Sequence, residues 1–207
     1  MMRPILIAAA VAASLGAAAS LGGARAQTTT LRAPADFAAT SDQAARARAL
    51  FGEAMKVIAS PRCMNCHPTS GGPTQGDDMH AHEPPVVRGA ADIGAPGMQC
   101  PTCHMPANTQ TIGDKIRSVP GDAAWRLAPA DMGWRGKSAG AICEQLKDKA
   151  RNGGRDLAAI HEHMATDHLV AWGWAPGEGR TSAPGTQEQF GAIIKAWIDA
   201  GAACPAP

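Results

Sequence analysis

Two short segments contain side chains whose types and spacing could support redox chemistry. Residues 63–67 and 100–104 both read C-x-x-C-H. In such a segment each thiol can form a thioether with a haem vinyl group, and the histidine is placed to ligate the iron from the proximal side. The sequence therefore predicts two covalently bound haem c groups. The attaching residues would be Cys63, Cys66, Cys100 and Cys103, and the proximal iron ligands would be His67 and His104.

Zinc sites and dithiol redox centres also use paired C-x-x-C segments. Neither of these chemistries explains the histidine that follows each pair. With seven histidines among 207 residues, a histidine would follow both pairs by chance only about one time in a thousand. The gap between the pairs also exceeds the usual zinc-ribbon spacing, so we favour haem over the two alternatives.

The first 26 residues have the pattern of a secretory signal peptide. Arg3 precedes an apolar run over residues 5–21, and Ala24-Arg25-Ala26 forms an A-x-A cleavage site. We therefore expect export to the periplasm. The alternative is a retained membrane anchor, and a membrane would be a partner only in that case. The run is rich in alanine, glycine and serine, which is weakly apolar for a spanning helix.

Cleavage after Ala26 would remove two arginines and no acidic residue, so the formal net charge would change from +1 to −1. No basic patch dominates the chain, and we expect no nucleic-acid partner. The remaining length suits one domain. We expect a flexible lead-in over residues 27–41 and a dihaem domain over residues 42–207.

Two cysteines remain outside the motifs. Cys143 and Cys204 are expected to form a disulfide, because exported thiols tend to oxidise. Two buried free thiols are the alternative.

The remaining pattern predicts a mostly α-helical fold with long loops that wrap the haem groups. Helices are expected over residues 43–60, 138–154 and 156–168, and a last helix between Thr186 and Gly201. On the third of these, His161 and His168 would share a face with Met164. Residues 68–97 contain many glycines and prolines and are expected to form an irregular loop around a haem.

Five histidines are left as candidates for the distal iron positions, and they fall in two short segments. One ligand is expected from His80 or His82, and the other from residues 161–168, with His161 or His163 first. Arg88 is expected to pair with a haem propionate. Methionines are the main competing ligands, namely Met79, Met98, Met105, Met132 and Met164.

Several segments resemble known families. The first and last predicted helices look like the terminal helices of class I cytochromes c. The run from residue 51 to 204 resembles a group of exported bacterial dihaem proteins labelled isoquinoline 1-oxidoreductase subunit. The similar segments are PRCMNCHP, QGDDMHAHEPPVVRGA, CPTCH, ICEQLKD, RNGG, HEHMATDHLVAWGW and GTQEQFGAIIKAWIDAGAACP.

This resemblance implies an electron-relay subunit that exchanges electrons with a redox partner protein. The partner would be a molybdenum hydroxylase or a respiratory-chain cytochrome. No molybdopterin or iron–sulfur motif is visible in the sequence, so we expect a carrier and not the hydroxylase itself. The alternative from the enzyme class is a dihaem peroxidase-like catalyst, which would need one iron with an open distal site.

Overall fold

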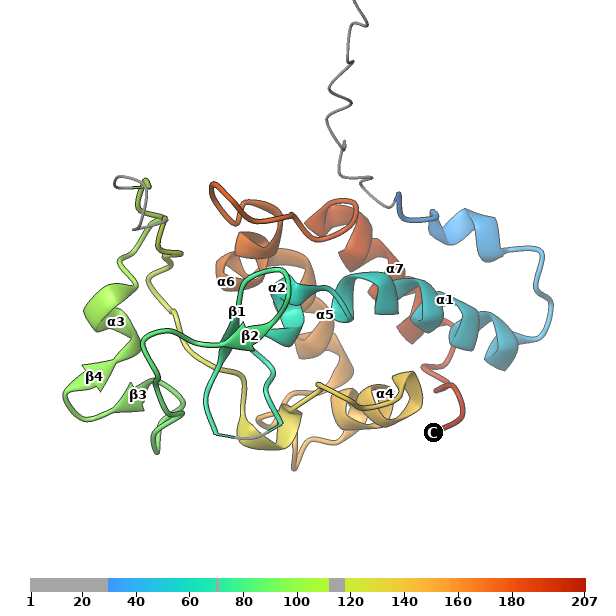
Figure 1. The fold of residues 1–207 in the computed structure, drawn as a ribbon. Helices are drawn as coiled ribbons and strands as arrows, with labels where there is room; N and C mark the ends of the chain where they lie inside the picture. Colours follow the sequence, from blue (N-terminus) through green and yellow to red (C-terminus); the bar gives the residue numbers. More distant parts are fainter. Residues whose placement is uncertain (1–29, 70, 112–117) are drawn as a thin grey trace, which may run out of the picture.

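The computed structural model describes residues 30–69, 71–111 and 118–207, and in these ranges the fold is mostly helical. The expected signal peptide, residues 1–26, lies outside the described residues. Within the described ranges, no helix is both long and apolar enough to cross a membrane. The longer helices are α1 (Gln43–Ile58), α4 (Ala139–Lys147), α5 (Leu157–Thr166) and α7 (Gln187–Asp199). They gather on one side of the molecule, and the second C-x-x-C-H motif lies on the other side beside small hairpins (Figure 1).

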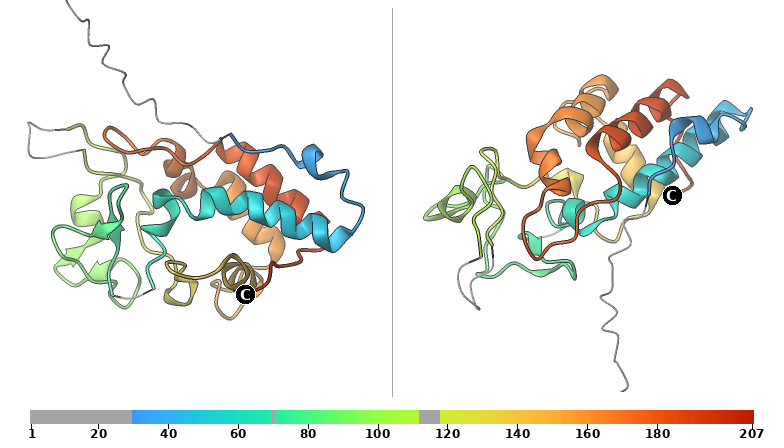
Figure 2. Two further views of the ribbon diagram at one scale, coloured as in Figure 1. Left: turned by 45° about the vertical axis from the view of Figure 1, so that its right-hand side comes forward. Right: turned by 90° about the horizontal axis from the view of Figure 1, so that it is seen from above.

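Helices α1 and α7 pack along each other and form the centre of the core (Figure 2). Phe51 on α1 and Trp197 on α7 are completely buried, with ring centroids 5.1 Å apart. Asp42 caps the start of α1 with its side chain, and Thr186 and Gln189 form a capping box at the start of α7. Both helices therefore begin where the sequence predicts.

Helix α4 is shorter than predicted. It begins at the expected place, with Ser138 as its cap, but ends at Lys147, short of the predicted end near residues 152–154. Asn152 is buried there and donates side-chain hydrogen bonds to two backbone carbonyls, which closes a turn in place of a further helical turn.

The helix predicted over residues 156–168 is divided in two. Asp156 caps α5, which ends at Thr166. Asp167 then accepts a hydrogen bond from the backbone N–H of Leu169 and caps the short helix α6 (His168–Ala171). Because the chain changes direction at this cap, the expectation that His168 continues one face of α5 is wrong.

The expected flexible lead-in is ordered where the structure describes it. Residues 34–37 form a 3₁₀ helix, η1 (Pro34–Phe37), and both Leu31 and Phe37 are buried in the core. The backbone N–H of Arg32 donates a hydrogen bond to the buried Glu53 carboxylate at 2.9 Å. Burial of two large apolar side chains offsets the entropy lost in ordering this segment.

The segment expected to be an irregular loop contains two short antiparallel hairpins. Strand β1 (Thr74–Gln75) pairs with β2 (His80–Ala81), and β3 (Gly94–Ala95) pairs with β4 (Met98–Gln99). The first hairpin holds two of the candidate histidines. The second leads directly into the turn of the second C-x-x-C-H motif.

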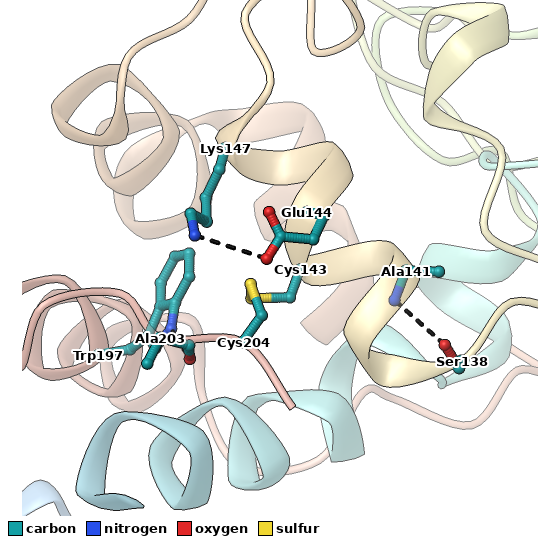
Figure 3. Close-up of a disulfide and its surroundings, with 8 residues drawn as sticks. All are labelled: Ser138, Ala141, Cys143, Glu144, Lys147, Trp197, Ala203 and Cys204. Atoms are coloured by element: carbon teal, nitrogen blue, oxygen red, sulfur yellow. Dashed lines mark hydrogen bonds and ion pairs between the residues drawn. A yellow bond between two sulfur atoms is a disulfide. The ribbon is translucent and has the colours of Figure 1, made fainter. Parts of the chain in front are cut away.

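The predicted disulfide is confirmed. Cys143 and Cys204 are joined with an S–S distance of 1.98 Å, which ties α4 to the segment after α7 (Figure 3). Beside it, the indole N–H of Trp197 donates a hydrogen bond to the carbonyl of Ala203 at 3.1 Å. The end of the chain is therefore held to the core by both a covalent bond and a hydrogen bond.

Candidate functional site

Both C-x-x-C-H motifs begin in a single helical turn, α2 (Pro61–Met64) in the first and α3 (Cys100–Cys103) in the second. Each turn has a proline in its first two positions. Backbone N–H groups there have no partner within the helix, so proline, which lacks an N–H, costs no hydrogen bond. Residues three apart in such a turn lie on the same side. The two thiols of each motif can therefore face one bound group.

The two motif histidines are held in the same way. Nδ1–H of His67 donates a hydrogen bond to the carbonyl oxygen of Met132 at 2.7 Å, and Nδ1–H of His104 donates one to the carbonyl oxygen of Pro120, also at 2.7 Å. A carbonyl can only accept, so Nδ1 carries the hydrogen in both rings. Burial lowers the pKa of His67 to about 3 and also lowers the pKa of His104, so both rings are neutral at pH 7. Each Nε2 therefore presents a lone pair to a metal ion.

Each motif histidine also lies flat against a tryptophan. The rings of His67 and Trp134 have centroids 3.4 Å apart and planes inclined by 7°. The rings of His104 and Trp125 have centroids 4.6 Å apart and planes inclined by 13°. Together with the Nδ1 hydrogen bond, the stacked indole fixes the orientation of each imidazole before any metal is bound.

A cavity of about 300 Å³ lies beside the first motif. Cys63, Cys66 and His67 form part of its wall, and most of the other lining is apolar. Four of the five tryptophans in the chain line it. Its size and lining are those of a site for an apolar cofactor. The main apolar and aromatic side chains around it are Ile58, Leu146, Ile160, Trp125, Trp172, Trp174 and Phe190.

Two buried donors at the wall of this cavity have no hydrogen-bond partner. They are Nε of Arg62 and Nε1 of Trp134. Arg62 is only 4 % exposed, and its Nη2 forms an ion pair with Asp77 at 2.5 Å. A buried donor without an acceptor is costly. The two donors therefore fit a ligand that brings carboxylates into an apolar pocket, as haem does with its propionates.

The properties of the first cysteine pair do not suit the rival chemistries. Burial raises the pKa of Cys63 to about 11 and the pKa of Cys66 to about 12, whereas a dithiol redox centre depends on a readily formed thiolate. In residues 30–69, 71–111 and 118–207, no three His, Cys, Asp or Glu side chains come together as a metal-binding group.

Among the candidate distal histidines, the structure brings His163 to the first motif. It lines the same cavity as His67, and its Nδ1 is bonded to the Asp167 carboxylate at 2.9 Å, which leaves Nε2 free. Met164 also lines the cavity and is buried. His161 is not among the cavity residues.

The two candidate histidines of the first hairpin, His80 and His82, differ in how their ring nitrogens are used. His80 is exposed, with Nδ1 bonded to Asp78 at 2.6 Å and Nε2 bonded to Gln75 at 3.0 Å. His82 has only Nδ1 engaged, with the carbonyl of Pro84 at 2.9 Å, and its ring faces that of His104 with centroids 6.0 Å apart. The second motif therefore has its own nearby histidine.

Arg88 is bound to the protein itself. Its guanidinium pairs with Asp92 at 2.6 Å and also donates to the backbone carbonyls of Ala128 and Pro68, and it does not line the cavity. The expected role of Arg88 with a propionate is therefore better matched by Arg62. The sequence analysis missed Arg62, which directly precedes the first motif and lies in the same helical turn as Cys63.

Sequence reasoning also missed the tryptophans. Five tryptophans in a chain with three phenylalanines and no tyrosine is an unusual aromatic composition. That imbalance was the available signal, but it does not identify which indoles stack on the motif histidines.

Comparisons with protein-family models, curated proteins and solved structures found no match.

Proposed function

We propose that this chain is a periplasmic c-type cytochrome that carries two covalent haems and relays single electrons. The observation that carries the proposal is the shared arrangement of the two motifs. In each, two cysteines three positions apart precede a neutral histidine whose Nδ1–H is held by a carbonyl, whose Nε2 is free and whose ring lies on a tryptophan.

The chain's own residues would hold each group at several points. Each thiol S–H would add across a vinyl C=C bond of the haem, with sulfur bonding to one carbon and hydrogen to the other, so nothing would be oxidised or released. His67 and His104 would bind iron through Nε2, and Arg62 and Trp134 would donate to a propionate at the first site. When bound, haem supplies the one-electron couple of its iron, and burial and ligation by the protein set the potential.

The position of Trp125 supports transfer of electrons between the two sites. Its ring stacks on His104 and also lines the cavity that contains His67. Trp172 meets Trp125 edge-on, with centroids 4.9 Å apart, and lines the same cavity. Cys100 contributes, after burial and Cys63, to the raised pKa of Cys66, as expected for motifs that lie near each other. A short distance between two redox groups favours electron transfer from one to the other.

The packing of α1 on α7 beside the first motif supports a cytochrome c-like fold, as the resemblance of these two helices implies. The disulfide agrees with export to an oxidising compartment. Histidine or methionine side chains stand near both proximal histidines, which favours saturated irons and a carrier over the peroxidase-like alternative. The redox partner would be a molybdenum hydroxylase or a respiratory-chain cytochrome.

An absorption spectrum of the full chain, produced in a host that matures c-type cytochromes, tests this function. We expect a Soret band, α and β bands on reduction, and two haems per chain in the pyridine haemochrome assay. Addition of carbon monoxide to the reduced protein should leave the spectrum unchanged if both irons are saturated. A soluble, folded chain without a Soret band would overturn the proposal, and an open, peroxide-reactive iron would favour the enzyme.

A further inference from the structure

We propose that His82 is the distal iron ligand at the second motif, opposite His104. The inference rests on the proposed function, since it needs a haem on Cys100 and Cys103. It goes further because it selects one histidine from the five outside the two motifs and assigns it to one of the two irons.

The separation of the two rings is the first argument. The centroids of His82 and His104 are 6.0 Å apart, and their planes are inclined by 58°. Two imidazoles that bind one metal ion from opposite sides have centroids roughly 6 to 6.5 Å apart, given metal–nitrogen bonds of about 2 Å and a ring radius of about 1.2 Å. The two histidines are therefore already separated as an axial pair requires.

The hydrogen bonds of the two rings are the second argument, and they are independent of the first. Nδ1–H of His82 donates to the carbonyl of Pro84 at 2.9 Å, as Nδ1–H of His104 donates to the carbonyl of Pro120 at 2.7 Å. Metal-binding histidines generally donate their other N–H to a backbone carbonyl or carboxylate. In both rings this leaves Nε2 as the metal-binding nitrogen.

The hairpin explains why His82 and not His80 is suited to this role. Pairing of β1 with β2 places His80 opposite Gln75, where the side chains of Gln75 and Asp78 engage both ring nitrogens. The backbone N–H of His82 donates to the carbonyl of Pro73 at 3.3 Å, which fixes the residue at the end of the hairpin. His80 would have to break one hydrogen bond to bind iron through either nitrogen, whereas Nε2 of His82 has no hydrogen bond to break.

The test compares His82→Ala with His80→Ala in the full, haem-loaded chain. We expect His82→Ala to retain two haems per chain, while half of the iron becomes high-spin in electron paramagnetic resonance and binds carbon monoxide when reduced. Added imidazole should restore the low-spin signal. His80→Ala should match the unmodified protein in all three measurements.

A second variant keeps the proposal testable if His82→Ala fails to accumulate. His82→Met should give one haem with a histidine–methionine spectrum and a raised reduction potential, and leave the other haem unchanged. Two haems per chain with all iron still low-spin in His82→Ala, or no methionine ligation in His82→Met, would overturn this inference alone. Absence of covalent haem from the unmodified chain would instead overturn the proposed function.

Discussion

The indole ring of Trp125 lies flat on the imidazole ring of His104, with centroids 4.6 Å apart, and the same indole lines the cavity beside the first motif. One side chain thus contacts the proximal histidine of one candidate haem site and borders the other site. The contact is held locally, because the backbone N–H of Trp125 donates a hydrogen bond to the carbonyl of Asp122 at 3.1 Å.

Replacement of Trp125 by leucine should therefore change the redox properties of the second site. Loss of the apolar ring would let water approach the haem proposed at His104, and water stabilises the more highly charged ferric state. We expect the potential of that haem to fall by up to roughly 60 mV, a tenfold change in the equilibrium. Spectroelectrochemistry would measure both potentials.

Two further variants serve as controls for Trp125→Leu. Trp125→Phe keeps an aromatic ring and should shift the potential much less. Trp197→Phe removes an indole from the core between α1 and α7, away from the motifs, and should leave both potentials unchanged. If the leucine variant differs no more than Trp197→Phe, Trp125 has no role at the site.

Removal of the disulfide should destabilise the protein without loss of haem. Cys143 and Cys204 are 61 positions apart, and a cross-link over that distance stabilises the folded state by about 4 kcal/mol in the chain-entropy model. We expect Cys143→Ala/Cys204→Ala to lower the free energy of unfolding by up to that amount in denaturant titrations. The haem count should stay at two.

The unmodified protein treated with a thiol reductant is the control for the disulfide variant, and its unfolding midpoint should fall to a similar value. A double variant as stable as the unmodified, oxidised protein would show that the bond contributes nothing to stability.

Glu53 should make stability depend on pH in the acidic range. Burial by itself raises the pKa of this carboxyl, but the hydrogen bonds from Lys56 and from the backbone N–H of Arg32 outweigh burial and hold the pKa below its ordinary value of 4.5. The ionised carboxylate therefore favours the folded state above pH 4.5, and this contribution is lost as the pH falls through the folded-state pKa.

The matched substitution for this prediction is Glu53→Gln. At pH 7 it should lower the free energy of unfolding by about 1 kcal/mol, and the difference from the unmodified protein should shrink at lower pH. Glu188→Gln, on the exposed start of α7, is the control and should have little effect. If the free energy of unfolding of Glu53→Gln stays below that of the unmodified protein by the same amount across the acid range, ionisation of Glu53 does not contribute to the pH dependence of stability.

What the sequence predicts correctly in this protein is mostly local. The starts of α1 and α7 follow from Asp42 and Thr186, whose capping bonds reach only three residues along the chain. The disulfide pairing followed from counting cysteines. Features that depend on distant contacts were missed, including the burial of Leu31 and Phe37. The break in the helix at residue 167 was also missed, although the capping bond from Leu169 to Asp167 is local.

The candidate site likewise combines features set by nearby residues with features set by distant ones. The cysteines and histidines of the two motifs are found from the sequence alone, because each motif is five consecutive residues. The carbonyl that orients His67 belongs to Met132, which is 65 positions away, and the ring that faces His104 comes from His82. No local pattern encodes such pairs, so the sequence left His80 or His82 open for one distal position and residues 161–168 open for the other. The choice between His80 and His82 depended on hydrogen bonds of the folded hairpin.

Mass spectrometry of the purified exported protein and of its proteolytic peptides tests the central claim most directly. We predict a chain that carries two haem additions, one on the peptide containing Cys63 and Cys66 and one on the peptide containing Cys100 and Cys103. Replacement of either cysteine pair by alanine should remove one addition and leave the other. A chain with neither addition, or one that carries zinc in place of haem, would contradict the account.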